Sequence, residues 1–333
     1  MTRQALTHKF TLGSKDAASH SMPDTEILTP DESGLSRAAE LLCGGSLIAF
    51  PTETVYGLGA DASDDHAVAR IFAAKNRPQF NPLIVHLPDL DAAREIAEFN
   101  DTAMRLAQAF WPGALTLVLP LKPDAGIAPL VSAGLPSIAI RLPDHPLAQR
   151  LLKRTQRPIA APSANPSGKI SPTTADHVRE GLTGQIEAIL DGGPCPVGVE
   201  STIIGVTDAP TLLRPGGLPA EAIQACLGTP LLHHIPDTPN APGQLASHYA
   251  PNARIRLNAT NPLPDEALLG FGKVQATLNL SPSEDLIEAA ANLFGHLHQL
   301  DKTAAKIAVS PIPYHGLGRA INDRLTRAAA PRP

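Results

Sequence analysis

Short apolar segments alternate with segments of helical periodicity through the first two thirds of the chain, and this alternation limits the possible folds most strongly. It begins with an apolar run at 46–50, a helical pattern at 65–76, an apolar run at 82–87 and a helical pattern at 91–99. The apolar runs are continuous, which is typical of strands that are covered on both faces of a sheet. The pattern therefore predicts an α/β fold with helices on both sides of the sheet.

Further apolar runs of strand length continue this pattern. They lie at 114–120, 137–142, 159–164, 188–190, 201–206 and 211–214, with helical patterns at 145–156 and 173–180. A second, smaller α/β unit is predicted near the C-terminus, with strands at 254–258, 268–271, 276–280 and 306–310 and helices at 283–300 and 318–329. The first of these two helices should open with a capping box, in which Ser281 is the N-cap, Pro282 follows and Glu284 completes the box.

The distribution of proline indicates how these units are divided. The chain has 34 prolines in 333 residues, and the stretch 228–252 holds five of them without visible periodicity. We therefore predict a first domain at 26–217, a linker at 218–252 and a second domain at 253–330. Residues 1–25 lack the apolar stretch of a secretory signal and are expected to form a disordered leader.

Charge and cysteine content exclude several classes of protein. The net charge of −5 argues against a protein whose whole surface clamps nucleic acid, and no apolar run reaches the ~18 residues of a membrane span. Three cysteines at unrelated spacings fit neither a disulfide framework nor a CxxC metal clip, which favours the reducing cytoplasm. Residues 141–170 carry six Lys or Arg and one Asp, so they mark either an anion site or the solvent face of a helix.

Four clusters of polar side chains follow predicted strands, which is where open α/β sheets bind ligands. The first spans 50–62, the second spans 73–86, the third joins Arg141 to residues 159–173, and the fourth spans 200–214. Each cluster taken alone also has a structural explanation, as a turn, a helix cap, a core histidine or a strand end. Their main polar side chains are Thr52, Glu53, Thr54, Tyr56, Lys75, Arg77, Asn81, His86, Arg141, Ser163, Asn165, Ser171, Glu200, Ser201 and Arg214.

Common catalytic and nucleotide-binding fingerprints are missing from the sequence. It contains no GxxxxGK[ST], no GxGxxG, no GxSxG and no HExxH, so we predict neither a Walker or Rossmann nucleotide site, nor a hydrolase triad, nor a transition-metal site. The four clusters offer cations and hydrogen-bond donors instead. Such groups stabilise charge on phosphate and carboxylate, which is the logic of phosphoryl or nucleotidyl transfer.

Taken in order, the motifs of this chain resemble the YrdC-like domain of the threonylcarbamoyl-AMP synthase family. The matching segments are FPTETVYGLGADA, AAKNRP with NPLIVH, WPGALTLVL, IAIRLP, APSANPSG with SPT, ESTII and LLRPGG, followed by PGQLASHYAP and GLGRAINDRLTRAA in the linker and second domain. The resemblance implies a twisted mixed sheet flanked by helices, a linker that crosses the active site, and a smaller Rossmann-like α/β domain.

The same resemblance implies a nucleotidyltransferase. Members of this family condense L-threonine, bicarbonate and ATP into L-threonylcarbamoyl-AMP and pyrophosphate, the first step of threonylcarbamoyladenosine modification of tRNAs that read ANN codons. Mg²⁺ is expected to accompany ATP without a protein metal site. The product is expected to pass to a tRNA threonylcarbamoyl transferase complex in the cytoplasm, and a direct contact with tRNA is left open.

The resemblance also implies roles for individual residues. Lys75 and Arg77 are expected to be catalytic, and Thr52 and Tyr56 to shape one wall of the site. The residues expected to bind L-threonine are Thr54, His86, Arg141, Ser163 and Ser201. The residues expected to bind ATP are Lys75, Arg77, Asn81, Ser137, Asn165, Ser171, Arg214 and Tyr249.

Two other functions are compatible with parts of this pattern. The first is a non-catalytic module of the same fold that binds RNA or a nucleotide in a basic groove. The second is a carbamoyltransferase, which would need zinc-finger or acylphosphatase-like sequence that this chain does not show. Because both Lys75 and Arg77 are present, together with the linker and second domain, the sequence favours the synthase.

Overall fold

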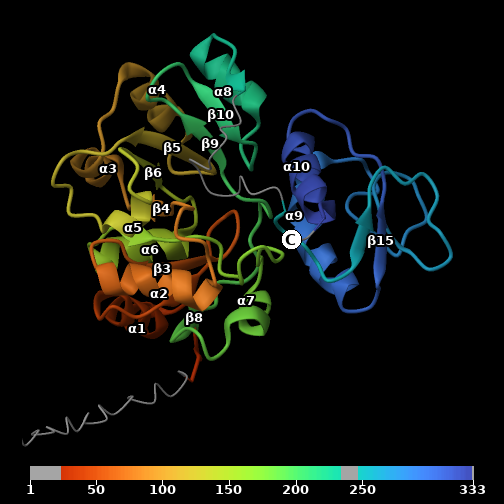
Figure 1. The fold of residues 1–333 in the computed structure, drawn as a ribbon, viewed down its shortest axis with the longest axis horizontal. Helices are drawn as coiled ribbons and strands as arrows, with labels where there is room; N and C mark the ends of the chain where they lie inside the picture. Colours follow the sequence, from red (N-terminus) through yellow and green to blue (C-terminus); the bar gives the residue numbers. More distant parts are fainter. Residues whose placement is uncertain (1–23, 234–246, 332–333) are drawn as a thin grey trace, which may run out of the picture.

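The computed structural model describes residues 24–233 and 247–331, which form two α/β domains side by side (Figure 1). The strands of the larger domain are β1 (Glu26–Leu28), β2 (Ile48–Phe50), β3 (Gly57–Asp61), β4 (Ile84–His86), β5 (Leu115–Pro120), β6 (Ser137–Arg141), β7 (Ile159–Ala160), β8 (Ala188–Leu190), β9 (Thr202–Gly205), β10 (Thr211–Arg214) and β11 (Leu232–His233). Its helices are α1 (Glu32–Cys43), α2 (Asp65–Lys75), α3 (Leu90–Ile96), α4 (Asp101–Phe110), α5 (Pro129–Ser132), α6 (Pro146–Thr155), α7 (Ala175–Leu182) and α8 (Ala220–Leu227).

The strands of the larger domain form one mixed sheet, in the order β1-β8-β2-β3-β7-β4-β6-β5-β9-β10-β11. Strands β4 and β6 run parallel, whereas β5 pairs antiparallel with β6. On β2, Ile48 and Phe50 pack into the core that contains α1 and α6, while Ala49 packs into the core that contains α2 and α4. Since successive strand residues point to opposite faces, helices cover both sides of the sheet, which confirms the predicted fold class.

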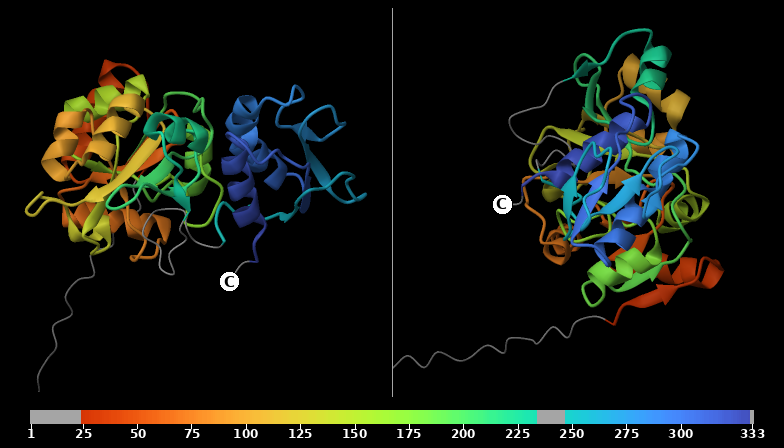
Figure 2. Two further views of the ribbon diagram at one scale, coloured as in Figure 1. Left: turned by 90° about the horizontal axis from the view of Figure 1, so that it is seen from above. Right: turned by 90° about the vertical axis from the view of Figure 1, so that its right-hand side faces the viewer.

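The second domain is a small parallel sheet with two helices packed on it. Its elements are β12 (Arg254–Arg256), β13 (Ala267–Gly270), β14 (Leu278–Asn279), α9 (Leu286–Asp301), β15 (Lys306–Val309) and α10 (Gly318–Ala329), with strand order β12-β15-β13-β14. Both helices lie between this sheet and the larger domain (Figures 1 and 2). Their apolar side chains share one core with Val55, Ile170 and Val199 of the larger domain. The boundary between the domains is therefore a packed apolar interface.

The predicted linker at 218–252 differs from the structure in its first part. Residues 220–227 form α8, whose Ile223 is buried in the core of the larger domain, and β11 pairs in parallel with β10. These residues therefore extend the larger domain, because one apolar anchor and one strand pairing suffice to fix a segment without clear periodicity. Of the remaining linker, 234–246 lie outside the described residues, as does most of the predicted leader.

Several other elements also differ from the sequence-based expectations. The helices α1 and α4 and the strands β1 and β3 were not predicted. Strand β3 is rich in glycine because it lies against the Phe50 ring, and a Cβ at Gly59 would lie 2.8 Å from a ring carbon of Phe50. Helix α9 begins at Leu286 with Asp285 as its N-cap. The predicted capping box is wrong because Glu284 has a φ of +64°, outside the helical range.

The basic stretch at 141–170 is largely paired with acids of neighbouring elements. Arg150 and Arg154 both form ion pairs with Glu32 of α1, and Arg157 pairs with Asp61. For these three arginines, the structure therefore favours a structural role over an anion site. None of the helices in the described residues is long and apolar enough to cross a membrane.

Candidate active site

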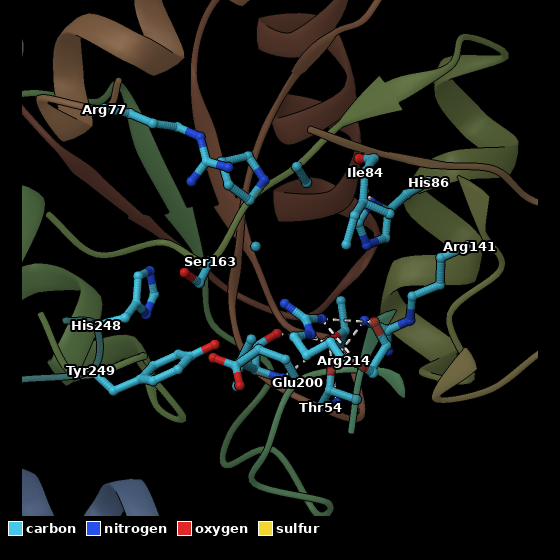
Figure 3. Close-up of a pocket in the computed structure, with 16 residues that line it drawn as sticks. Thr54, Arg77, Ile84, His86, Arg141, Ser163, Glu200, Arg214, His248 and Tyr249 are labelled. Atoms are coloured by element: carbon cyan, nitrogen blue, oxygen red, sulfur yellow. Dashed lines mark hydrogen bonds between the residues drawn. The ribbon is translucent and has the colours of Figure 1, made fainter. Parts of the chain in front are cut away.

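A cavity lies between central strands of the large sheet and the segment that enters the second domain (Figure 3). It is lined by Thr52, Thr54, Val55, Gly57, Arg77, Ile84, His86, Arg141, Ala161, Pro162, Ser163, Glu200, Ser201, Arg214, His248 and Tyr249. These residues come from all four polar clusters and from the segment that enters the second domain. The cavity therefore joins parts of the chain that lie far apart in sequence.

One side of the cavity is built around Arg141 at the end of β6. Its guanidinium forms an ion pair with Glu53, with 2.6 Å between Nη2 and Oε1, and donates through Nη1 to the Thr54 hydroxyl at 2.8 Å. All three side chains are buried. A buried guanidinium held in this way presents a fixed, planar cationic group to a carboxylate ligand.

His86 lies beside Arg141, because the parallel register of β4 and β6 places the two residues opposite each other. Burial lowers the pKa of His86 to about 3, with a further contribution from the positive charge of Arg141. Its Nδ1 lies 3.2 Å from the carbonyl oxygen of Ile84, so Nδ1 carries the proton. The ring is thus neutral near pH 7.

Lys75 and Arg77 leave the end of α2 in different directions. Between them Asn76 adopts a left-handed conformation with φ +50°, which ends the helix. Lys75 is buried beneath the loop after β7, where its Nζ donates to the carbonyl oxygens of Ser163, at 2.5 Å, and Asn165. Burial, reinforced by the charge of Arg77, lowers the pKa of Lys75 well below its usual value. Lys75 therefore fixes the loop, and Arg77 reaches the cavity.

Arg77 and Arg214 bring positive charge to the cavity wall. Arg77 donates to the backbone carbonyls of Asn81 at 3.2 Å and Pro82 at 2.9 Å, and within 24–233 and 247–331 it forms no ion pair with a carboxylate. Burial and the charge of Arg214 lower the pKa of Arg77 to about 10, so it remains cationic. Arg214 donates through Nη2 to the carbonyl oxygen of Ser201 at 2.9 Å. Two desolvated cations close together favour an anionic ligand.

Glu200 is the second carboxylate of the cavity, and its main partner comes from the second domain. The Nε of Arg324 on α10 lies 2.7 Å from Oε2 of Glu200, and the Ser171 hydroxyl donates to Oε1. Burial alone would raise the pKa of Glu200, but the charges of Arg324 and Arg214 outweigh it and hold the pKa at about 2. Glu200 is therefore an anion that is compensated across the domain boundary.

The predicted site residues fall into two groups. Those that line the cavity are Thr54, Arg77, His86, Arg141, Ser163, Ser201, Arg214 and Tyr249. Those that do not line it are Lys75, Asn81, Ser137, Asn165 and Ser171; Lys75, Asn81 and Ser171 nevertheless contact residues of the lining. Thr52 lines the cavity as expected, but the Tyr56 hydroxyl turns away from it and donates to the Gly193 carbonyl oxygen at 2.8 Å.

Arg324 lies in the motif GLGRAINDRLTRAA, but the sequence predicts no role for it in the site. It belongs to an amphipathic helical pattern with several polar neighbours, where an arginine is expected to face solvent. Glu53 and Glu200 stood in the polar clusters but received no role. A carboxylate directly before a threonine or serine at a strand end was the available signal for both.

The larger domain matches the family model described as "Telomere recombination" over residues 40–216, and residues 218–330 match the model described as "Threonylcarbamoyl-AMP synthase, C-terminal domain". The threonylcarbamoyl-AMP synthase of Bacillus subtilis is 41% identical over 335 residues, which cover 92% of this chain and 96% of that protein. The chain belongs to the threonylcarbamoyl-AMP synthase family. The resemblance drawn from the motifs is thereby confirmed, and the chain is an enzyme of this type.

Other relatives of the synthase family support the same assignment. The threonylcarbamoyl-AMP synthase of Pyrococcus abyssi is 41% identical over 321 residues, covering 89% of this chain and 94% of that protein. A crystal structure of P. abyssi Sua5 complexed with L-threonine superimposes with a TM-score of 0.85 and 40% identity, and covers 92% of this chain and 98% of that one. The family assignment therefore extends over both domains.

Proposed function

We propose that this enzyme condenses L-threonine, bicarbonate and ATP into L-threonylcarbamoyl-AMP and pyrophosphate. The observation that carries the proposal is the division of the cavity into two kinds of cationic site. Arg141 is paired with Glu53, whereas Arg77 donates only to backbone carbonyls among the described residues and is close enough to Arg214 for that charge to lower its pKa. The first suits the single carboxylate of an amino acid, and the second suits a triphosphate. The names of the relatives and the threonine complex of P. abyssi Sua5 support these substrates.

The threonine site in this proposal is the Arg141 side of the cavity. Arg141 receives the carboxylate of threonine, and its fixed geometry lowers the entropy cost of orienting the ligand. We also assign to threonine a contact with the neutral ring of His86, which lines the cavity beside Arg141. The remaining contacts that we assign to threonine are those of Thr54, Ser163 and Ser201.

The reaction begins at the amine of threonine, which combines with bicarbonate to give an N-carboxylate and water. An oxygen of this carboxylate forms a bond to the α-phosphorus of ATP, and the bond from that phosphorus to the oxygen bridging to the β-phosphate breaks. Pyrophosphate leaves with that bridging oxygen. A closed site favours this sequence because N-carboxylates decarboxylate readily in water.

ATP is assigned to the Arg77 side of the cavity. Arg77 and Arg214 stabilise negative charge on the phosphates as it moves to the leaving group. Lys75 acts from beneath, through the loop of Ser163 and Asn165 that its Nζ holds. Further contacts with ATP are proposed for Asn81, Ser137, Asn165, Ser171 and Tyr249.

We propose Mg²⁺ as the counter-ion of ATP. The described residues contain no group of three His, Cys, Asp or Glu side chains that could hold a metal ion. Glu200 in the lining and Glu53 behind Arg141 both form ion pairs with arginines. In this proposal Mg²⁺ arrives bound to phosphate oxygens and water.

The fate of the product follows from its chemistry. A mixed carbamic–phosphoric anhydride is an activated acyl donor, so we propose that it passes to a tRNA threonylcarbamoyl transferase complex in the cytoplasm. We assign no tRNA surface, because Arg150, Arg154 and Arg157 already pair with acids.

The experiment that tests the proposal is pyrophosphate release by purified protein with ATP and Mg²⁺, with threonine and bicarbonate omitted in turn. Release should require both. If ATP or RNA binds but no pyrophosphate appears, the alternative of a non-catalytic binding module replaces the synthase. Strong salt dependence of RNA binding would then identify the basic-groove version of that alternative.

A further inference from the structure

Arg324 brings a charge of the second domain into the wall of the cavity. It is the largest fully buried side chain of the described residues, with 0% exposure. Besides its ion pair with Glu200, it donates through Nη1 to the carbonyl oxygen of Pro215 at 2.9 Å and to Asp323 at 2.7 Å. Glu200 and Pro215 belong to the larger domain, so one side chain connects α10 to two segments of the active-site wall.

The same guanidinium lies against Tyr249, which also lines the cavity. Its central carbon is 5.1 Å from the centre of the tyrosine ring, within the range of a cation–π contact. Phe294 of α9 packs on the ring at 5.7 Å between ring centres. The backbone N–H of His248 donates to the carbonyl oxygen of Arg327 at 3.3 Å. The segment that carries Tyr249 thus rests on the two helices of the second domain.

Charge explains why the position of Arg324 matters for the cavity. Glu200 is anionic and its hydrogen-bond partner Ser171 is uncharged. Without Arg324, the buried Glu200 carboxylate would keep only the more weakly acting charge of Arg214 as compensation, beside the space that we assign to the triphosphate. A like charge in a desolvated site opposes an anionic ligand strongly, because water does not screen it.

We propose that Arg324 is a positioning residue of the active site, which neutralises Glu200 and holds Tyr249 so that the second domain completes the ATP side of the cavity. This inference rests on the proposed function for the identity of the ligand. It assigns to the second domain a direct part in nucleotide binding, with the interdomain ion pair as the physical connection.

The test compares Arg324→Met and Arg324→Lys with a matched control, Lys302→Ala. Lys302 forms an ion pair with Glu180 across the same domain boundary, at 2.5 Å, but both side chains are exposed and away from the cavity. Arg324→Met should raise the KM for ATP by about tenfold or more, the usual cost of removing a group that holds a binding side chain. The KM for threonine should change less. Arg324→Lys should fall between wild type and Arg324→Met, and Lys302→Ala should match wild type.

A second substitution separates a charge effect from general loss of structure. In a Glu200→Gln background the buried anion that Arg324 neutralises is absent, so Arg324→Met should raise the KM for ATP by a smaller factor than it does with Glu200 present. Circular dichroism and thermal melting identify any variant that fails to fold. The inference is overturned if folded Arg324→Met keeps the wild-type KM for ATP, or if Glu200→Gln leaves its effect unchanged.

The same variants distinguish failure of this inference from failure of the proposed function. Wild-type protein that releases no pyrophosphate contradicts the proposed function. Hydrogen exchange of residues 247–252 still tests the connection in that case, because it needs no turnover. Faster exchange in Arg324→Met than in Lys302→Ala supports the inference, and equal exchange contradicts it.

Discussion

Two buried arginine–glutamate pairs, each with one member in the lining of the cavity, differ in one respect. Arg141 and Glu53 both belong to the larger domain, whereas Arg324 and Glu200 come from different domains. Both pairs are short, at 2.6 and 2.7 Å, and all four side chains are less than a tenth exposed. The chemistry is therefore the same, but the first pair forms when one domain folds and the second only when two domains dock.

This difference separates a ligand-binding group that forms within one domain from one that depends on the docking of two domains. A pair within one domain fixes a ligand-binding group independently of the rest of the chain. A pair across the boundary makes the site depend on domain packing, which is itself maintained by the apolar core that Val55, Ile170 and Val199 share with α9 and α10. The threonine side should therefore tolerate weakening of the interface better than the ATP side.

The largest effect is expected from breaking the pair within the larger domain. Arg141→Ala leaves Glu53 buried without its cation, which should lower the free energy of unfolding by roughly 3–5 kcal/mol and raise the KM for threonine more than that for ATP. Denaturant unfolding and initial rates measure the two effects. Arg150→Ala, which removes an exposed ion pair with Glu32, is the control. An unchanged KM for threonine would reject the role of Arg141.

Arg77→Ala should affect the ATP side of the cavity without affecting the threonine side. Arg77 lines the cavity and its partners are backbone carbonyls, so its removal costs transition-state charge stabilisation more than folding. The kcat should fall about a hundredfold, with the KM for threonine little changed. Single-turnover pyrophosphate release measures the loss, and Arg94→Ala on the exposed face of α3 is the control. A normal rate would move the phosphate site elsewhere.

Lowering the pH should destabilise the packing of the two domains against each other. His177 of α7 and His298 of α9 stack with 3.9 Å between ring centres, and His298 Nε2 lies 3.2 Å from the Ser171 carbonyl oxygen. Burial, followed by the charge of His298, lowers the pKa of His177 to about 4. Glu180 and Lys302, which face the pair, act in opposite directions.

The sign of the pH effect follows from these pKa values. Between an unfolded pKa of about 6.5 and the folded value of about 4, the unfolded chain binds more protons, so stability falls as the pH falls. Burial lowers the pKa of His298 as well, so His298 contributes with the same sign. His298→Gln keeps a side-chain donor but removes this titrating group. The melting temperature of His298→Gln should therefore decrease less than that of wild type when the pH is lowered from about 7.5 to about 5. Parallel decreases would show that the histidine pair does not contribute.

The smallest effect is expected from the exposed pair at the same boundary. Lys302→Ala removes the contact with Glu180 and should cost about 0–1 kcal/mol, because solvent screens both charges. Arg319→Ala, which removes the contact with Glu221, should behave alike. Unfolding in urea at low and high salt measures both. A loss comparable to that of Arg324→Met would show that the boundary depends on charge in general and not on the buried pair.

Local sequence patterns predicted most elements that carry the site. The apolar runs predicted β4, β6, β9 and β10, and the polar residues at their ends supplied four of the eight predicted side chains that line the cavity, namely His86, Arg141, Ser201 and Arg214. Helices α1 and α4 were missed. Periodicity alone does not reveal ion pairs or apolar contacts with distant parts of the chain. Leu35 of α1, for example, is buried in the core that α1 shares with α6.

The sequence by itself determined the fold class, the family and the groups of residues that form the cavity, because periodicity and motif order are local properties of the chain. Only the tertiary structure decided which cations are compensated and by which acids. Glu200 and Arg324 are 124 positions apart and belong to different domains, and nothing in the pattern around either indicates the other. Partner choice for a buried charge depends on which surfaces dock and exclude water, and that is fixed only when the domains pack.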